Sequence, residues 1–418
     1  MARSGTDPTE TTIVATGEPA GEHELTVDVG ILLSHSPRES RDDMAAFAER
    51  LADDVVDELT SATGAAWQFF ACEIDKLPDT ASRRPSEFLD EAALRMVEGP
   101  YDLLVVVTDV PLVSRREQPM PGLASPLSRV AVVSTWRLRV GPRKEPTRAL
   151  DSPAVRWNGA TLLLHLLGHV LGANHGGGSA DDSAMAPFRF DPERRSLPTF
   201  DAYAERYLHR VATRIPEEET TERGPISRLW FHVLSAVRNP DQVVDALVHS
   251  RAPLLPLSLP KLSTAAVTPT LVIVFSAESW DVGFNLTNQT AVLFAASSIL
   301  AATVHILYAQ NLFFPQEHRQ IVTEHTALVN VATVLILLTA IIGLFVLVGI
   351  ITLFIELVVF PPNLMTNWPS LENPQVGLVD LVRTGAFIST IGVLSGALAG
   401  GLENRTLVRH LALFRDRP

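Results

Sequence analysis

Three histidines lie close together in segment 165–175, which reads HLLGHVLGANH. His165 and His169 are four residues apart, so on a helix both imidazoles leave the same face and can bind one ion. Gly172 follows at a position where a helix can end with a residue that tolerates positive φ, and the turn can bring His175 to the same ion. Three neutral nitrogen ligands with a fourth position for water are a catalytic type of zinc site. The sequence therefore predicts one zinc ion held by these three histidines.

This spacing resembles the signature of the metzincin metallopeptidases, H-E-x-x-H-x-x-G-x-x-H followed by a methionine turn. Met185, in segment 183–187, is similar to the methionine of that turn, which in the family lies beneath the metal and supports the histidines. Within the clan the chain looks closest to the archaemetzincins, because a buried strand, a loop and an edge strand precede the histidine helix. The resemblance covers roughly residues 25–215. It implies a peptide-binding edge strand running from Val130 to Thr135.

The chain departs from the family pattern at two places. The glutamate that follows the first histidine in the family, and takes a proton from zinc-bound water, is Leu166 here. Leucine cannot accept a proton, so the resemblance implies metal binding without the usual general base. The cysteines that hold a second, structural zinc in archaemetzincins are also missing, because Gly176 stands at that position and Cys72 is the only cysteine.

Three functions are open at this point. The first is a membrane-anchored, metzincin-like zinc-binding protein that is a degenerate peptidase and captures a peptide or protein partner by strand addition. The second is an active membrane-bound zinc metallopeptidase with another base, for which Asp181 and Asp182 are candidates because they lie between His175 and Met185. The third is a regulatory or sensor component of a membrane complex.

The histidine helix is expected inside an α/β domain. Segments with strand-type hydrophobicity alternate along the chain with segments of helical periodicity, which favours a mostly parallel sheet covered by helices. A stretch with four prolines, 111–126, is expected to be a loop. The expected strands are 25–33, 67–74, 101–110 and 129–138, and the expected helices are 37–60, 85–97 and 160–171.

The last third of the chain has a different composition. Residues 281–418 hold 8 acidic and 6 basic residues. Three stretches in it, 291–309, 327–355 and 384–402, are apolar and long enough for membrane-spanning helices, which need about 20 residues. The sequence thus predicts an all-α transmembrane domain behind the α/β domain. The expected divisions are a disordered tail at 1–22, the zinc-binding domain at 23–215, a helical connector with a proline-rich linker at 216–262, and the membrane domain at 263–418.

The third apolar stretch carries Gly392, Gly396 and Gly400 at steps of four. Small residues on one helix face let helix backbones approach closely in lipid. The partner is either another helix of the same chain or a second copy, which would give a homodimer. Segment 264–277 is a candidate for a fourth crossing.

The chain starts without an apolar segment, so we expect the soluble domain in the cytoplasm, at the plasma membrane of a prokaryote. The net charge of −13 and the pI near 5.4 argue against a nucleic-acid partner.

Overall fold

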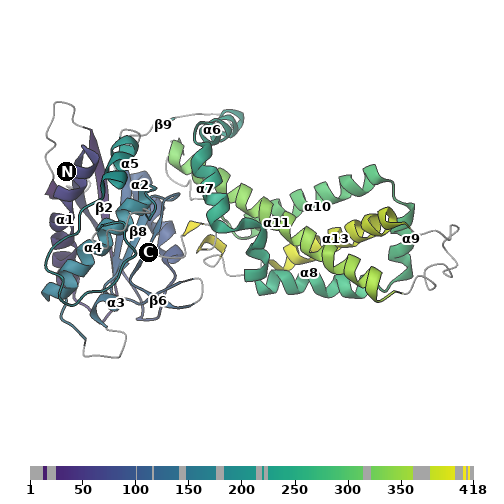
Figure 1. Ribbon diagram of the computed structural model, residues 1–418, viewed down its shortest axis with the longest axis horizontal. Coiled ribbons are helices and arrows are strands. Elements are labelled where there is room, and N and C mark those ends of the chain that lie inside the picture. Colours follow the sequence, from purple (N-terminus) through teal and green to yellow (C-terminus); the bar gives the residue numbers. More distant parts are fainter. Residues whose placement is uncertain are drawn as a thin grey trace, which may run out of the picture. The chain divides into compact units, whose positions relative to one another are not determined.

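The computed structural model describes most of the chain in two compact units (Figure 1). Unit 1 comprises Met1–Phe231, Pro315–Ala327 and Leu413–Pro418, and unit 2 comprises His232–Phe314 and Leu328–Ala412. The described residues are 13–16, 25–99, 101–114, 117–140, 147–175, 183–212, 219–220, 225–313, 322–360, 377–400, 408–410 and 413–414.

Unit 1 is built around a six-stranded sheet with the strand order β1-β3-β2-β4-β8-β7. The four inner strands are parallel, and the outer strands β1 and β7 run antiparallel to their neighbours. The expectation of a mostly parallel sheet is confirmed. The strands are β1 Ile13–Thr16, β2 Thr26–His35, β3 Ala66–Lys76, β4 Leu103–Thr108, β7 Gly122–Ser125 and β8 Val130–Ser134, and two short pairs join β5 Leu112–Val113 to β6 Pro119–Met120 and β9 Glu219–Thr220 to β10 Val322–Thr323.

The edge of the sheet differs from the prediction. The strand expected at the edge from Val130 to Thr135 is β8, which lies between β4 and β7, and it ends at Ser134 because Thr135 begins the short helix α3 (Thr135–Arg139). The edge strand is β7, inside the segment that was expected to be a loop. Its four residues, Gly-Leu-Ala-Ser, carry too little apolar alternation to indicate a strand, and pairing with β8 creates it.

The opposite edge of the sheet, strand β1, also differs from the prediction. Residues 1–22 were expected to be a disordered tail, but Ile13–Thr16 form β1 and pair antiparallel with Phe70, Phe69 and Gln68 of β3. The polar composition of the tail predicts low local order, whereas strand pairing depends on a partner that is distant in sequence.

Two layers of helices cover the sheet. The connection through α1 (Arg41–Thr63) leads from β2 to β3, and the connection through α2 (Leu89–Glu98) returns across β2 to β4. Right-handed crossovers in opposite directions place α1 and α2 on opposite faces. The helix α4 (Pro153–Val170) packs against α1 on the first face, together with α5 (Ala202–Ala212).

The helix α4 is apolar on all sides because it lies in the core. Ser152 precedes it in an extended conformation and Pro153 occupies its first position, where the missing N–H costs nothing. From Asn158 to Val170 every residue is buried. A helix that is hydrophobic all round is typical of a core position, so the histidines of α4 extend from a rigid support.

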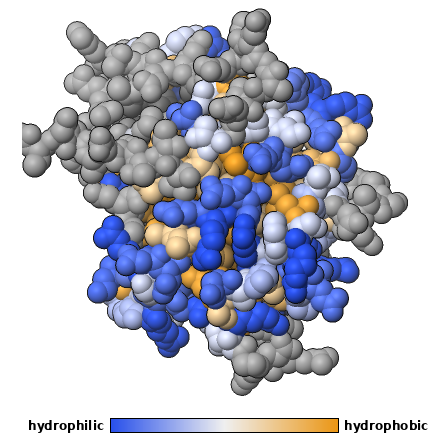
Figure 2. Space-filling view, turned by 90° about the vertical axis from the view of Figure 1, so that its left-hand side faces the viewer, coloured by the Kyte–Doolittle hydropathy of each residue, from blue (hydrophilic) through white to orange (hydrophobic). Residues whose placement is uncertain are grey.

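Unit 1 buries its large apolar side chains. Among the described residues before Leu229, the one large hydrophobic residue with high exposure is Tyr203. The side of this unit drawn in Figure 2 is dominated by hydrophilic side chains. This surface is that of a domain in contact with water.

Unit 2 consists of helices in its described part. Three of them are long and apolar enough to cross a membrane: Asn288–Ala309 within α10, Thr326–Val358 within α11 and Leu378–Ala399 within α13. They lie at the three predicted spans. The helices are α7 Pro240–Ser250, α8 Pro260–Ile273, α9 Ala277–Asn285, α10 Asn288–Ala309, α11 Glu324–Val358 and α13 Leu378–Gly400, a 3-10 segment covers Ala252–Ser258, and α6 Pro225–Arg238 contains the boundary between the units.

The surface of unit 2 is apolar where lipid would contact it. Val292 and Leu293 of α10, Phe354 of α11 and Leu398 of α13 are each more than half exposed. Such a surface is stable against hydrocarbon and unfavourable in water. This chain is therefore a membrane protein by the length, composition and exposed surface of its helices.

The helices α8 and α9 form a pair bent by 92°, which counts as a fourth crossing only if the two are taken as one span. Gly392 and Gly396 of α13 face α8 of the same chain. A Cβ on Gly392 would lie 2.5 Å from Thr270 Oγ1, and one on Gly396 would lie 2.9 Å from Ala266 Cβ. Gly400 is the last residue of α13. The close approach that the first two glycines permit is made within the chain.

Candidate metal centre

The end of α4 brings the third histidine back towards the first two. Gly172 has φ +90°, its N–H donates to the carbonyl of His169, and the N–H of Ala173 donates to the carbonyl of Gly168. These two bonds form a Schellman motif, which ends a helix by a left-handed glycine. A Cβ at Gly172 would also lie 2.7 Å from the hydroxyl of Tyr207. Glycine is thus required here by backbone conformation and by space.

Each of the three histidines is oriented by a backbone carbonyl. Nδ1 of His165 lies 2.8 Å from the carbonyl of Ala184, Nδ1 of His169 lies 2.8 Å from the carbonyl of Ala173, and Nδ1 of His175 lies 2.9 Å from that of Met185. A carbonyl oxygen only accepts, so each Nδ1 carries the proton. The Nε2 nitrogens are then the atoms with a lone pair for a metal, which is the usual arrangement of ligating histidines.

The three imidazoles converge on one point. One nitrogen from each of His165, His169 and His175 lies within 4.8 Å of the others, and the ring centroids are 4.5 to 5.2 Å apart. His165 and His169 are buried, and His175 is exposed. Nε2 of His165 is buried with no hydrogen-bond partner among the described residues. Such an atom is costly unless it binds something, and a metal ion fits it.

The environment of His165 keeps its ring neutral. Burial lowers the pKa of His165 to about 4, the hydrogen bond to Ala184 opposes this shift, and the neighbouring His175 adds to it. A histidine must be neutral to donate a nitrogen lone pair to a metal. The imidazole of His165 is therefore neutral at neutral pH and can donate a nitrogen lone pair to a cation.

The turn around Met185 holds two of the three histidine rings through main-chain carbonyls. It supplies two of the three carbonyls, from Ala184 and from Met185 itself, and the side chain of Met185 is 1% exposed. The sulfur packs on α4 at Gly168, where a Cβ would lie only 2.4 Å from Sδ. The bridge between Ser183 and Thr199 and the bond from the N–H of Ala184 to the carbonyl of Thr199 hold the turn in place.

Leu166 is a residue of α4 whose side chain is buried against the edge of the sheet. It is 0% exposed, and a Cβ on Gly122 of β7 would lie 2.7 Å from its Cδ1. The side chain next to the first histidine therefore points towards the edge strand, and it fills that space with methyl groups.

The other predicted site residues are placed as follows. Asp181 and Asp182 lie outside the described residues, and so does Gly176. Among the described residues, no carboxylate and no cysteine joins the cluster formed by the three histidines.

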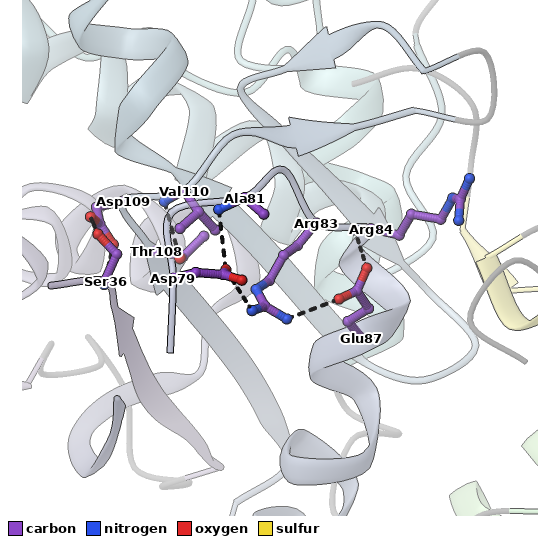
Figure 3. A network of polar contacts seen from close by, with 9 residues as sticks. All are labelled: Ser36, Asp79, Ala81, Arg83, Arg84, Glu87, Thr108, Asp109 and Val110. Atoms are coloured by element: carbon purple, nitrogen blue, oxygen red, sulfur yellow. Dashed lines mark hydrogen bonds and ion pairs between the residues drawn. The ribbon is translucent and has the colours of Figure 1, made fainter. Parts of the chain in front are cut away.

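A second polar cluster lies at the carboxyl ends of β2 and β4, where the strand order changes direction and open α/β sheets often bind ligands. Ser36 donates to Asp109 through its N–H (2.7 Å) and through its hydroxyl (2.5 Å). Nearby, Arg83 joins Asp79 to Glu87 (Figure 3). A cavity of about 180 Å³ adjoins Ser36 and Asp109. Because Ser36 already satisfies both oxygens of Asp109, the cluster stabilises the loops, and we assign it no ligand.

No family model matches the chain, and no curated protein sequence matches it. Solved structures do. The archaemetzincin of Methanopyrus kandleri has 21% identity and a TM-score of 0.32 over 45% of this chain and 97% of that one. A zinc-dependent peptidase of Methanocorpusculum labreanum has 19% identity and a TM-score of 0.29 over 43% of this chain and 100% of that one. The archaemetzincin of Archaeoglobus fulgidus, solved with malonate, has 18% identity and a TM-score of 0.29 over 43% of this chain and 99% of that one.

The chain is similar to archaemetzincins. This is the similarity predicted from the histidine spacing and the methionine turn, and it spans less than half of the chain. The helices of unit 2 follow that part, as expected for a fusion to a membrane domain.

The sequence did not indicate the three carbonyls that orient the imidazoles. Ala173, Ala184 and Met185 act through main-chain oxygens, which every residue type has. The signal that could have located them is positional, because Ala173 directly follows the helix-ending glycine and the other two form the methionine turn.

Proposed function

We propose that this chain is a membrane-anchored zinc-binding protein whose histidine centre does not hydrolyse peptides by the general-base route. His165, His169 and His175 would hold one zinc ion through Nε2. Zinc bound in this way supplies a Lewis acid and an activated water. The backbone carbonyls of Ala173, Ala184 and Met185 would fix the three rings and raise their basicity towards the metal.

The observation that carries the proposal is the burial of Leu166 against Gly122. General-base catalysis needs a side chain that accepts a proton within hydrogen-bond reach of the attacking water. The residue that follows His165 offers an apolar side chain with no exposed surface. Loss of a positioned base typically costs about 10²–10⁴ in rate, so we expect peptide hydrolysis to be slower by that factor while the three zinc ligands remain.

Peptide binding is the role that such a centre can keep. Strand addition uses main-chain hydrogen bonds at a sheet edge and needs no base. The strand at this edge is β7, Gly122–Ser125, which ends the sheet next to α4. Its residues are buried and the hydroxyl of Ser125 donates to the carbonyl of Leu413, so a bound peptide would have to displace that contact. A peptide captured there would pair with the strand whose Gly122 packs on Leu166 of α4.

The test uses the full chain purified in detergent and loaded with zinc. We expect about one zinc per chain and no hydrolysis of a broad peptide library above a chelated control. Hydrolysis by the wild-type chain that disappears in His169→Ala would overturn the proposal and favour an active peptidase. In that case Asp181→Asn and Asp182→Asn would identify the base, since these are the nearest carboxylates to His175 in the sequence.

A further inference from the structure

The helical unit holds a carboxyl group in an unusual place. Glu356 lies near the C-terminal end of α11, inside the 33-residue apolar segment Thr326–Val358. Its side chain is 1% exposed, and neither oxygen has a hydrogen-bond partner among the described residues. Acidic residues are rare inside apolar spans, and where they occur they are generally functional.

The carboxyl group of Glu356 lies against Gly385 of α13, a position without a side chain. A Cβ on Gly385 would be 3.9 Å from each carboxyl oxygen, so α13 presents backbone and no side chain at this point. The preceding residue, Thr384, has a buried hydroxyl that is likewise without a hydrogen-bond partner in the described part of the chain. A Cβ on Gly283 of α9 would lie 2.6 Å from that hydroxyl. Three helices thus meet around two unsatisfied polar groups.

The surroundings of this junction are apolar. A cluster of buried side chains from α9, α11 and α13 and from the segments beside them packs there. Its members are Val274, Trp280, Ile355, Phe360, Leu381 and Ile388. Trp280 donates its indole N–H to the carbonyl of Val274, so it makes no bond to the carboxyl group.

The charged groups of the neighbouring helices are engaged elsewhere. On α13, Arg383 donates to Asp380 and to the carbonyls of Gly283 and Phe284. On α9, Glu278 accepts from the hydroxyl of Ser276, and Asp281 accepts from Asn285.

Two further helices pack on α13. The titratable side chains of α10 are His305 and Tyr308, which are both exposed, and the one of α8 is Lys261, at the opposite end of that helix from its junction with α9. The described residues therefore offer Glu356 no counter-charge.

An ionised carboxylate without a counter-charge or hydrogen-bond donors is unfavourable in such a place, and a proton removes the charge at once. We propose that Glu356 is a proton-binding site of the helical unit, occupied by a proton at neutral pH. The neutral acid carries no charge, so it needs no counter-ion in this apolar junction. Release of the proton leaves a bare charge in the junction of α9, α11 and α13, so proton release favours separation of these helices.

The test measures the protonation state directly on the full chain in detergent or lipid nanodiscs. Infrared spectra at neutral pH should contain the carbonyl band of a protonated carboxylic acid, and Glu356→Gln should lose this band. Glutamine has nearly the shape of the neutral acid, so the variant should fold. The matched control is Glu278→Gln, which removes an exposed acid of α9 and should leave the band unchanged.

A second measurement needs no variant. Dicyclohexylcarbodiimide modifies protonated carboxyl groups in apolar surroundings, and mass spectrometry locates the adduct. Labelling of wild-type protein should fall on Glu356, decrease as pH is raised, and spare Glu278. A protonated-acid band that is equal in the wild type and Glu356→Gln, or labelling of Glu278 in place of Glu356, would overturn the proposal, because neither result leaves a proton on Glu356.

Discussion

Replacing Gly168 with alanine tests whether the methionine turn holds the metal ligands in place. Gly168 precedes His169 on α4, and its missing side chain leaves room for the sulfur of Met185. An added Cβ would lie 2.4 Å from Sδ and 3.2 Å from Cε1 of Phe200. Met185 is 1% exposed, so it has little space into which it can move. We expect the turn to shift away from the helix.

The effect on stability should be small because two terms oppose each other. Overpacking of a filled core costs about 1–3 kcal/mol, and alanine stabilises a helix interior by about 1 kcal/mol relative to glycine. The net loss is about 0–2 kcal/mol in the metal-free protein. The effect on zinc should be larger, because the turn also supplies the carbonyls that orient His165 and His175. Loss of such support typically lowers metal affinity about 10–100-fold, or about 1.4–2.7 kcal/mol.

The assay is a zinc titration of the full chain in competition with a chromophoric chelator, followed by thermal unfolding with and without zinc. Gly159→Ala is the matched control, since it lies on the same helix and its Cβ would meet Leu51 and Phe47 at 3.0 Å, away from the histidines. It should change stability by a similar amount and leave zinc affinity unchanged. Wild-type affinity in Gly168→Ala, or equal weakening in both variants, would refute the role of the turn.

Three further results are expected. His165→Ala and His169→Ala should each remove most of the zinc measured by elemental analysis, and unchanged zinc content in both would contradict the ligand assignment. Chelation should lower the unfolding temperature of the wild-type chain, since a ligand that binds only the folded state stabilises it, and it should not change that of His169→Ala. Leu166→Glu should add zinc-dependent peptide hydrolysis of about 10²-fold or more over the wild type at some loss of stability, because the carboxylate enters a fully buried position; the same rate in Leu166→Gln would show that the gain does not come from a base.

Local sequence patterns were sufficient for the central elements of unit 1. The alternation of apolar and helical segments predicted β2, α1, β3, β4 and α4, because each carries its own hydrophobic signal. Both edge strands were missed. β1 and β7 have four residues each, and β7 is made of small side chains, so their order comes from hydrogen bonds to neighbours that are distant in sequence. A single sequence contains no signal for that pairing.

The membrane helices were predictable for a similar reason, with one instructive difference at their ends. The apolar stretch 327–355 was expected to end before the first charged residue, whereas α11 continues to Val358 and includes Glu356. A rule that ends a span at a charge cannot detect a charge that the fold buries. Only the packing of α9 and α13 around α11 shows that Glu356 belongs to the interior.

The histidine centre and Glu356 follow from one physical rule applied to two kinds of atom. A buried polar atom without a partner is unfavourable, so its presence indicates a ligand that completes it. In His165 the hydrogen bond from Nδ1 to the carbonyl of Ala184 leaves the lone pair on Nε2. The imidazoles of His169 and His175 converge on the same point. The ligand that fits there is a cation with several coordination positions. Glu356 belongs to no cluster of three ligating side chains among the described residues, so a proton, which needs one acceptor, is the cation that fits. The number of converging donors thus decides which cation each site takes.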